Sequence, residues 1–222
     1  MDIAQYVLDF VNQTHRSIFL TGKAGTGKTT LLHQIIATTY KNVMVAAPTG
    51  IAALNAKGVT LHSLFQLPLA TFVPSTVVDV SLVENVNVVT PKTLIQRQKM
   101  NAYKRKMLRK LELLIIDEVS MLRADTLDMI NTVLKSIRGS SAPFGGVQVL
   151  FIGDLLQLPP VVKPQEWELL QQYYKGIFFF HSKVIEENPP LYLELEKVYR
   201  QSDTNFVKIL NHLRTNEISR ED

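Results

Sequence analysis

The stretch Gly22-Lys-Ala-Gly-Thr-Gly-Lys-Thr29 constrains this chain more than any other. It matches the pattern G-x-x-x-x-G-K-[ST], and it lies between a short apolar segment, residues 17–21, and a helix-like segment, residues 30–37. Glycines at such a junction let backbone N–H groups curl around a phosphate, and the helix N-terminus adds partial positive charge. A glycine-rich turn that matched by chance would lack the strand and the helix. The stretch therefore predicts a loop that binds a nucleoside triphosphate.

The loop residues have separate expected roles. Lys28 is expected to reach the β- and γ-phosphates, and the Thr29 hydroxyl to ligate Mg²⁺. The remaining phosphate contacts are expected from Gly22, Ala24, Gly25, Thr26, Gly27 and Thr30. The pattern thus predicts ATP and Mg²⁺ as cofactors.

A second stretch, residues 113–118, predicts hydrolysis as well as binding. It is an apolar strand that ends on two carboxylates, Asp117 and Glu118, which is the Walker B pattern. We expect Asp117 to hold Mg²⁺, directly or through water, and Glu118 to accept a proton from the attacking water. Adjacent acids at the end of a buried strand are costly unless a cation lies beside them. A site that only binds nucleotide has less need of the second acid.

Polar residues follow two other expected strands, residues 43–47 and 147–152. Open α/β sheets place ligand loops at the carboxyl ends of their strands. The candidates are Thr49, Thr60, His62 and Ser63 after the first of these strands, and Gln157 after the second. A loop with satisfied hydroxyls and a buried histidine explains the first group equally well. Gln157 can sense a γ-phosphate or position a water, but it can equally lie in a turn.

Five expected strands alternate with helices, and the phosphate loop follows the first of them. The strands are residues 17–21, 43–47, 113–118, 147–152 and 191–195. This order predicts an α/β fold of the RecA-like P-loop NTPase type, with a mostly parallel central sheet flanked by helices. We expect residues 1–65 and 95–222 to form the two parts of one ATPase domain. Residues 66–94, valine-rich and poor in charge, are expected as an insertion between the second and third core strands, either a small hairpin or a partly ordered loop.

A basic segment follows the insertion. Residues 95–110 contain no acid and are expected to form one helix. The basic residues are Arg97, Lys99, Lys104, Arg105, Lys106, Arg109 and Lys110. Such a cluster is typical of contact with a phosphate backbone, and it is equally typical of a solvated helix face. The net charge of +4 permits an anionic partner and is weak evidence for one.

Composition bears on location. The chain has no cysteine, which fits a reducing compartment and excludes thiolate metal sites. No apolar run approaches the ~20 residues that span a bilayer, and the first residues lack the pattern of a signal peptide. We expect a cytoplasmic protein without a membrane partner, associated with the nucleoid if the organism is bacterial.

Several of these stretches together resemble a known family. Residues 47–53 with 58–63, then 114–121, 153–161 and 198–202, stand in the order found in Pif-type helicases, the RecD-like branch of superfamily one. The resemblance covers almost the whole chain. It implies ATP-driven movement in the 5′-to-3′ direction on single-stranded DNA and unwinding of duplex junctions, by a protein expected to act as a monomer.

The resemblance also implies roles that the residues alone do not give. Gln5, otherwise expected at the surface, stands at the position of the adenine-recognising glutamine, and Tyr199 where an aromatic ring stacks on adenine. Gln157 matches a glutamine that couples the γ-phosphate to DNA. Arg200 matches an arginine that stabilises charge on the transferred phosphoryl group.

The resemblance implies that single-stranded DNA is bound by Pro48, Thr49, Thr60, His62 and Ser63. His62 would stack on a base, and the hydroxyls would meet phosphates. The insertion at residues 66–94 occupies the place of the duplex-splitting wedge, and this assignment rests on position alone.

Superfamily-one helicases use two RecA-like domains, and every matched motif belongs to the first. The motifs of the second domain would follow Asp222, so we expect either a fragment or a second half supplied from elsewhere. By itself the chain is expected to bind ATP and Mg²⁺, to bind DNA weakly, to hydrolyse slowly and not to unwind. The alternatives are a P-loop ATPase or kinase acting on a small molecule, and a nucleotide-gated DNA-binding module without turnover.

Overall fold

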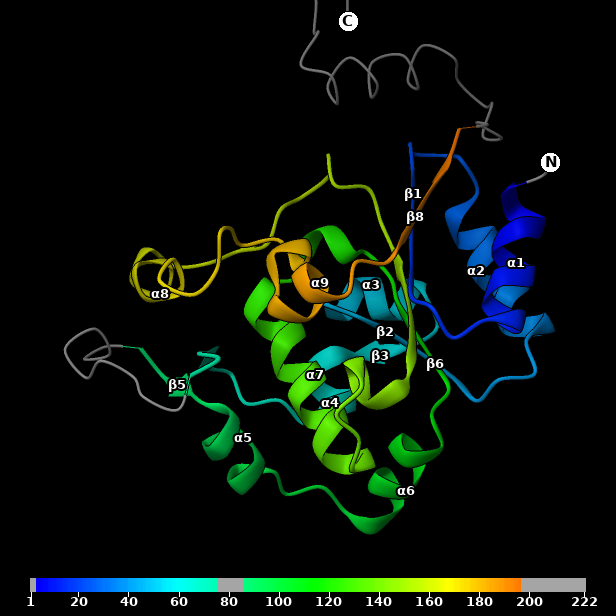
Figure 1. Ribbon diagram of the computed structural model, residues 1–222. Coiled ribbons are helices and arrows are strands. Elements are labelled where there is room, and N and C mark those ends of the chain that lie inside the picture. The colour runs from blue at the N-terminus through cyan, green and yellow to red at the C-terminus, as the bar shows by residue number, and fades with distance from the viewer. Residues whose placement is uncertain (1–2, 76–85, 197–222) are drawn as a thin grey trace, which may run out of the picture.

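A six-stranded sheet organises the computed structural model, which describes residues 3–75 and 86–196 (Figure 1). The strand order is β3-β2-β6-β7-β1-β8, and every pair of neighbours is parallel. The strands are β1 (Ile18–Gly22), β2 (Val43–Ala47), β3 (Val59–Thr60), β6 (Leu113–Ile116), β7 (Gln148–Ile152) and β8 (Leu191–Leu195). All five strands expected from the sequence are present, and β3 is a short additional edge strand. The expected α/β fold of RecA-like P-loop type is confirmed.

Helices cover both faces of this sheet, as a parallel sheet built from apolar strands requires. On one face, Ile18, Leu20 and Ile115 pack under α1 (Ile3–Gln13) and α2 (Lys28–Thr38). On the other face, Phe19 and Leu114 join a larger cluster with α7 (Ala124–Arg138). Alternate residues of each strand thus enter different cores, and β1, β6 and β7 are buried along their whole length.

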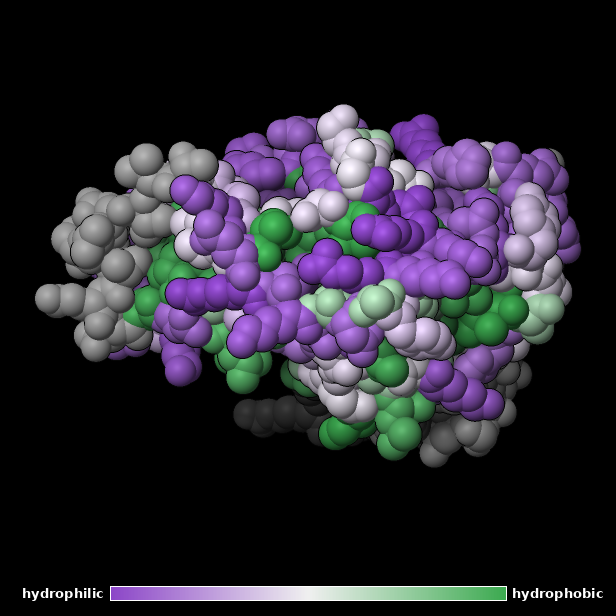
Figure 2. Space-filling view, turned by 90° about the horizontal axis from the view of Figure 1, so that it is seen from below, coloured by the Kyte–Doolittle hydropathy of each residue, from purple (hydrophilic) through white to green (hydrophobic). Residues whose placement is uncertain are grey.

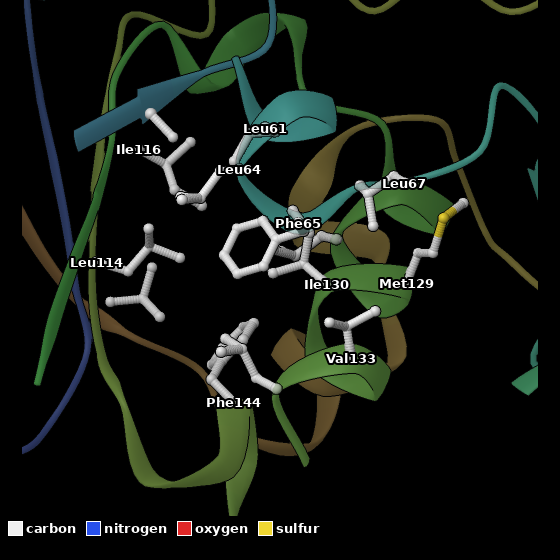
Figure 3. Close-up of a cluster of buried hydrophobic side chains, with 14 of the residues drawn as sticks. Leu61, Leu64, Phe65, Leu67, Leu114, Ile116, Met129, Ile130, Val133 and Phe144 are labelled. Atoms are coloured by element: carbon white, nitrogen blue, oxygen red, sulfur yellow. The ribbon is translucent and has the colours of Figure 1, made fainter. Parts of the chain in front are cut away.

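The remaining helices are short. They are α3 (Gly50–Asn55), α4 (Leu61–Phe65), α5 (Pro91–Arg97), α6 (Ala102–Lys110), α8 (Pro164–Leu170) and α9 (Lys183–Glu187). Helix α4 is anchored by Phe65, whose ring points between Leu114 and Ile116 of β6 and Ile130 of α7 (Figure 3). No helix within the described ranges is long and apolar enough to cross a bilayer.

The single helix expected over residues 95–110 is wrong, because the structure has two helices there. Helix α5 ends at Arg97, and α6 begins after Asn101, whose side chain accepts a hydrogen bond from the Lys104 amide at 2.8 Å. Asn101 has an extended backbone and caps α6, so the helical spacing of apolar residues across this point is accidental. Gln98, between the helices, donates its side-chain amide to the Phe65 carbonyl at 2.8 Å.

The insertion contains a second, two-stranded sheet. Strand β4 (Thr71–Phe72) pairs with β5 (Val88–Val89), and the pairing is parallel. The arms of a hairpin are antiparallel, so these two strands are not a hairpin. Residues 76–85, which carry most of the valine-rich run, lie outside the described residues.

A buried lysine ties α1 to the sheet. The Lys41 ammonium donates hydrogen bonds to the Val11 carbonyl at 2.5 Å, the Thr14 carbonyl at 2.6 Å and the Gln148 Oε1 atom at 2.7 Å. Its side chain is buried, and burial lowers the pKa of the Lys41 ammonium, an effect that nearby Glu112 opposes. The three acceptors belong to the end of α1, the loop before β1 and the start of β7.

Replacing Lys41 with methionine is expected to destabilise the fold by about 2–4 kcal/mol, because buried acceptors lose their donor. Urea unfolding followed by circular dichroism measures this free energy. Lys92→Met, at an exposed position of α5, is the control and should change it by less than about 0.5 kcal/mol. Equal unfolding midpoints for the two variants would contradict the role of Lys41.

Candidate functional site

Loops at the carboxyl edge of the sheet enclose a cleft of about 440 Å³. It lies between the segments that follow β1, β2, β6 and β7, the arrangement that open α/β sheets use for ligands. The lining includes Thr29, Thr49, Asp117, Glu118 and Gln157, all of them residues expected from the sequence to act in the site. Ile51, Ala52, Asn55, Ser120, Met121 and Leu158 complete it.

The loop after β1 has the backbone that its glycines permit. Gly25 and Gly27 have φ values of 82° and 87°, in the left-handed region. At Gly22 a Cβ would lie 2.6 Å from the Thr26 hydroxyl and 2.7 Å from the Leu195 carbonyl, so glycine is required for close packing against β8. Gly27 is the N-cap of α2 and has no side chain to cap it, which leaves the first-turn N–H groups to an anion.

Lys28 and Thr26 fold onto the same loop. The Lys28 ammonium donates to the Gly22 carbonyl at 2.6 Å and the Lys23 carbonyl at 3.1 Å, and the Thr26 hydroxyl donates to the Lys23 carbonyl at 2.9 Å. Thr29 and Thr30 are exposed at the start of α2. The ammonium is therefore held at the mouth of the loop.

Asp117 and Glu118 are two partly buried acids that line the cleft directly after β6. Burial raises the pKa of Asp117, opposed by the hydrogen bond from the Glu118 amide at 3.0 Å and by the charge of Lys28. Burial, then the Asp117 charge, raises the pKa of Glu118. Glu118 has a φ of 51°, unusual for a residue with a side chain, and the chain turns there into the short helix Val119–Met121.

The donor set fits Mg²⁺. It offers the Thr29 hydroxyl and the Asp117 carboxylate, hard oxygen ligands of the kind this cation takes together with substrate phosphates. No group of three carboxylates, histidines or cysteines able to hold a metal occurs in the described part of the chain. The site accordingly lacks an all-protein cage and suits a cation that arrives with a nucleotide.

Gln157 lies at the rim of the cleft on the turn that follows β7. The Gln157 backbone amide donates to the Asp154 carbonyl at 3.0 Å, and Asp154 Oδ1 accepts the Leu156 backbone amide at 3.2 Å. Gln157 therefore lies in a turn and also lines the cleft, and its role toward a γ-phosphate or a water stays a prediction.

Of the two adenine candidates, only Gln5 falls within the described residues. Gln5 is exposed on α1 and donates to Asp9 of the same helix at 2.9 Å, and it does not line the cleft. Tyr199 and Arg200 lie outside the described residues.

The DNA candidates cluster on α3 and α4. The Thr49 hydroxyl accepts the Ala52 amide at 3.3 Å, and the Thr60 hydroxyl accepts the Ser63 amide at 3.2 Å, so each threonine caps a helix. Each hydroxyl keeps a proton to donate. Pro48 is half-buried after β2 and precedes the first cap, and Ser63 is exposed.

His62 is half-buried on α4, within electrostatic range of Arg123 and Asp125 at the start of α7. Burial, and then the charge of Arg123, lowers the pKa of the His62 imidazole, while Asp125 opposes them. A lowered pKa favours the neutral ring at neutral pH, and a neutral ring suits stacking more than ion pairing.

A polar cluster near His62 was not predicted from the sequence. Arg123 Nε lies 2.8 Å from Asp125 Oδ1 and Nη2 lies 2.9 Å from Oδ2, a forked pair on a carboxylate that is 1% exposed. Arg123 Nη1 also lies 3.2 Å from Glu166 Oε2. Asp125 could be read as an acid at a helix start. The pairing of Arg123 with both Asp125 and the distant Glu166 has no local signal in the sequence.

This cluster fastens the insertion to the core. The Asp125 carboxylate accepts the Phe72 amide at 3.1 Å, and Glu166 Oε1 accepts the Thr71 hydroxyl at 3.1 Å. Hydrogen bonds and ion pairs of this cluster thus join strand β4 to helix α8 and to the start of α7. Arg123 follows Glu118 by five residues in the chain.

A family model described as PIF1-like helicase matches residues 2–222. The chain belongs to the PIF1-like helicase family. The resemblance to Pif-type helicases inferred from the motifs is confirmed.

Individual relatives agree with the PIF1-like assignment. The ATP-dependent DNA helicase PIF7 of Trypanosoma brucei brucei is 37% identical over 217 residues, 96% of this chain and 20% of that protein. Human ATP-dependent DNA helicase PIF1 is 36% identical over 212 residues, 93% of this chain and 28% of that protein. The Bacteroides Pif1 helicase crystallised with ADP-AlF3 and ssDNA superposes with a TM-score of 0.86 and 42% identity, over 100% of this chain and 47% of that one. The chain therefore spans less than half of each of these relatives.

Replacing Arg123 with methionine is expected to destabilise the fold by about 3–5 kcal/mol, because the buried Asp125 carboxylate loses its partner. Urea unfolding measures the loss. Arg123→Lys keeps the charge without the forked hydrogen bonds, so its free energy of unfolding should lie between those of the parent protein and Arg123→Met. Arg16→Met, at an exposed position before β1, is the control and should lie within about 0.5 kcal/mol of the parent protein. An Arg123→Met protein as stable as this control would show that the pair contributes nothing.

Proposed function

We propose that this chain is the first, ATP-binding and ATP-hydrolysing motor domain of a 5′-to-3′ DNA helicase. The observation that carries the proposal is the convergence of Thr29, Asp117, Glu118 and Gln157 on one cleft beside the Lys28 loop, in a member of the PIF1-like family. Coupled to a second RecA-like domain, hydrolysis would drive movement along single-stranded DNA and unwinding at duplex junctions.

The phosphate loop would bind the nucleotide through its backbone. The uncapped N–H groups at the start of α2 would surround the β-phosphate, together with Gly22, Ala24, Gly25, Thr26, Gly27, Lys28, Thr29 and Thr30. The Lys28 ammonium would exchange the loop carbonyls for phosphate oxygens. Gln5 and Tyr199 are proposed to contact adenine, in keeping with the family motif order.

Hydrolysis requires a base, and Glu118 is proposed for that role. Its raised pKa makes the carboxylate a stronger base than an exposed glutamate, and Gln157 at the rim would position the attacking water. Mg²⁺, when bound through Thr29 and Asp117, would neutralise charge on the phosphates. Arg200 is proposed to stabilise charge on the transferred phosphoryl group.

The residues proposed to bind single-stranded DNA are Pro48, Thr49, Thr60, His62 and Ser63. The cleft and the DNA candidates share Thr49, which lines the cleft and caps α3. This shared element supports coupling between the nucleotide and the strand. The structure bound to ADP-AlF3 and ssDNA is that of the Bacteroides relative, and binding of both ligands by this chain is part of the proposal.

Residues 66–94 would be the wedge that splits the duplex, and the motor would work as a monomer. The absence of cysteine fits a cytoplasmic location, at the nucleoid if the organism is bacterial.

Steady-state ATPase of this chain, with and without oligo-dT, tests the proposal beside a longer chain that carries a second RecA-like domain after Asp222. The motor proposal expects brisk turnover, raised by DNA, from the longer chain alone. Brisk turnover by the 222-residue chain that ignores DNA would instead indicate a small-molecule ATPase or kinase. Nucleotide-dependent DNA binding without turnover in either chain would indicate a binding module.

Glu118→Gln in the longer chain is expected to keep ATP affinity within about twofold and to lower turnover by about 100-fold or more, because it removes the base and keeps the shape. Fluorescent-nucleotide titration and phosphate release measure the two quantities. Glu168→Gln, on the exposed side of α8, is the matched control and should turn over normally. Normal turnover by Glu118→Gln would overturn the assignment of the base.

A further inference from the structure

Two segments that line the cleft touch each other at a glycine. Gly153 follows β7 and begins the turn that carries Gln157, and Val119 follows Glu118 after β6. A Cβ at Gly153 would lie 2.9 Å from the Val119 backbone nitrogen, 3.0 Å from Val119 Cγ1 and 3.3 Å from the Ser120 backbone nitrogen. Ordinary contacts of a Cβ lie at 3.4–4 Å, so the two segments approach more closely here than a residue with a side chain allows.

Space alone favours glycine at position 153. The φ of Gly153 lies outside the left-handed region, so an alanine would fit the backbone conformation. The atom that a Cβ would meet first belongs to the backbone of Val119, and it cannot rotate away as the end of a long side chain can. An alanine would therefore have to move one segment relative to the other, by about 0.5 Å to reach an ordinary contact.

The sheet holds both segments on their far sides. The Gly153 amide donates to the Leu20 carbonyl of β1 at 3.3 Å, and the Asp117 amide donates to the Ala46 carbonyl of β2 at 2.9 Å. The pairing of β6 with β7 ends at Phe151. Beyond that pairing, the contact at Gly153 joins the two segments directly.

The turn at residues 118–121 is positioned by its backbone. Within it, the Met121 amide donates to the Glu118 carbonyl at 3.1 Å. The Ser120 hydroxyl is buried and has no hydrogen-bond partner in the described part of the chain, so it does not fix the turn. Val119 is the neighbour of Glu118 in the chain. A displacement of the Val119 backbone therefore moves Glu118 as well.

Gln157 is connected to Gly153 in the same way. Asp154 follows Gly153 directly and is 2% exposed, and its carbonyl accepts the Gln157 backbone amide at 3.0 Å. The Asp154 carboxylate also lies within electrostatic range of Glu118. A shift at Gly153 would therefore reach Gln157 through a buried residue.

We propose that Gly153 is a positioning residue for ATP hydrolysis, because the missing side chain sets the separation between Glu118 and Gln157. This inference rests on the proposed motor function, in which Glu118 takes a proton from the attacking water and Gln157 orients that water. Both side chains must reach one water molecule. Misplacement of a catalytic group by about 1 Å can lower the rate about 100-fold, so the close approach at Gly153 has a direct kinetic value.

Gly153→Ala, in the longer chain that carries a second RecA-like domain, tests this spacing. Single-turnover phosphate release with oligo-dT present is expected to slow about tenfold or more, because the base and the water-positioning residue move apart. Fluorescent-nucleotide affinity should stay within about twofold, since the phosphate loop is untouched. In the steady state, kcat should fall and KM should change little, as expected when groups that act in the transition state are displaced.

Gly145→Ala is the matched control for crowding. A Cβ at Gly145 would lie 2.7 Å from the Leu134 carbonyl, and its φ is 63°, but Gly145 precedes β7 at the amino edge of the sheet. Helix α6 lies at the same edge, which Figure 2 shows from below, with hydrophilic side chains in a band across it. In urea unfolding this variant should lose stability, as Gly153→Ala does, and yet it should release phosphate at the parent rate.

The outcomes separate this inference from the motor proposal. Absence of ATP turnover in the longer parent chain would contradict the motor proposal itself. Parental turnover by Gly153→Ala, or equal slowing in Gly145→Ala, would overturn only the role of Gly153. A Gly153→Ala protein that no longer binds nucleotide, beside a Gly145→Ala protein that does, would show that the glycine serves the fold, and would also overturn the positioning role.

Discussion

The structure depends on one constraint, the burial of a parallel sheet between two layers of helices. Strands β1, β6 and β7 have no exposed residue, so their backbone groups must be paired with neighbours and both their faces must be covered. Parallel pairing then brings the carboxyl ends of all six strands to one edge. Residues as distant as Thr29 and Gln157 line one cleft for this reason, with no direct bond between them required.

The same constraint explains how much the sequence could predict. Apolar runs identified every long strand, the glycine pattern located the loop between β1 and α2, and the acidic pattern located Asp117 and Glu118 at the end of β6. Short-range patterns carry this information because each motif is contiguous. The two-residue strand β3 has too few residues for a pattern, and the cap at Asn101 divides a segment whose apolar spacing looks continuous.

What the sequence could not give is pairing between distant residues. Arg123, Asp125 and Glu166 meet where the start of α7 and the segment of α8 share a small apolar cluster of Ala124, Leu170 and Tyr174. The parallel pairing of β4 with β5 likewise has no signal in strands of two residues each. These contacts decide how the insertion is held, and they follow from the three-dimensional arrangement of elements that are individually unremarkable in the sequence.

The anchoring of α4 by Phe65 affects how a force applied to residues 60–63 would be transmitted to the sheet. The ring is enclosed between β6 and α7, so the loop before it cannot slide along the sheet without opening the core. A DNA strand held at residues 60–63 would therefore pull on the rigid body that also carries Asp117 and Glu118. In the proposed motor, load on this loop would reach Asp117 and Glu118 with little loss to local stretching.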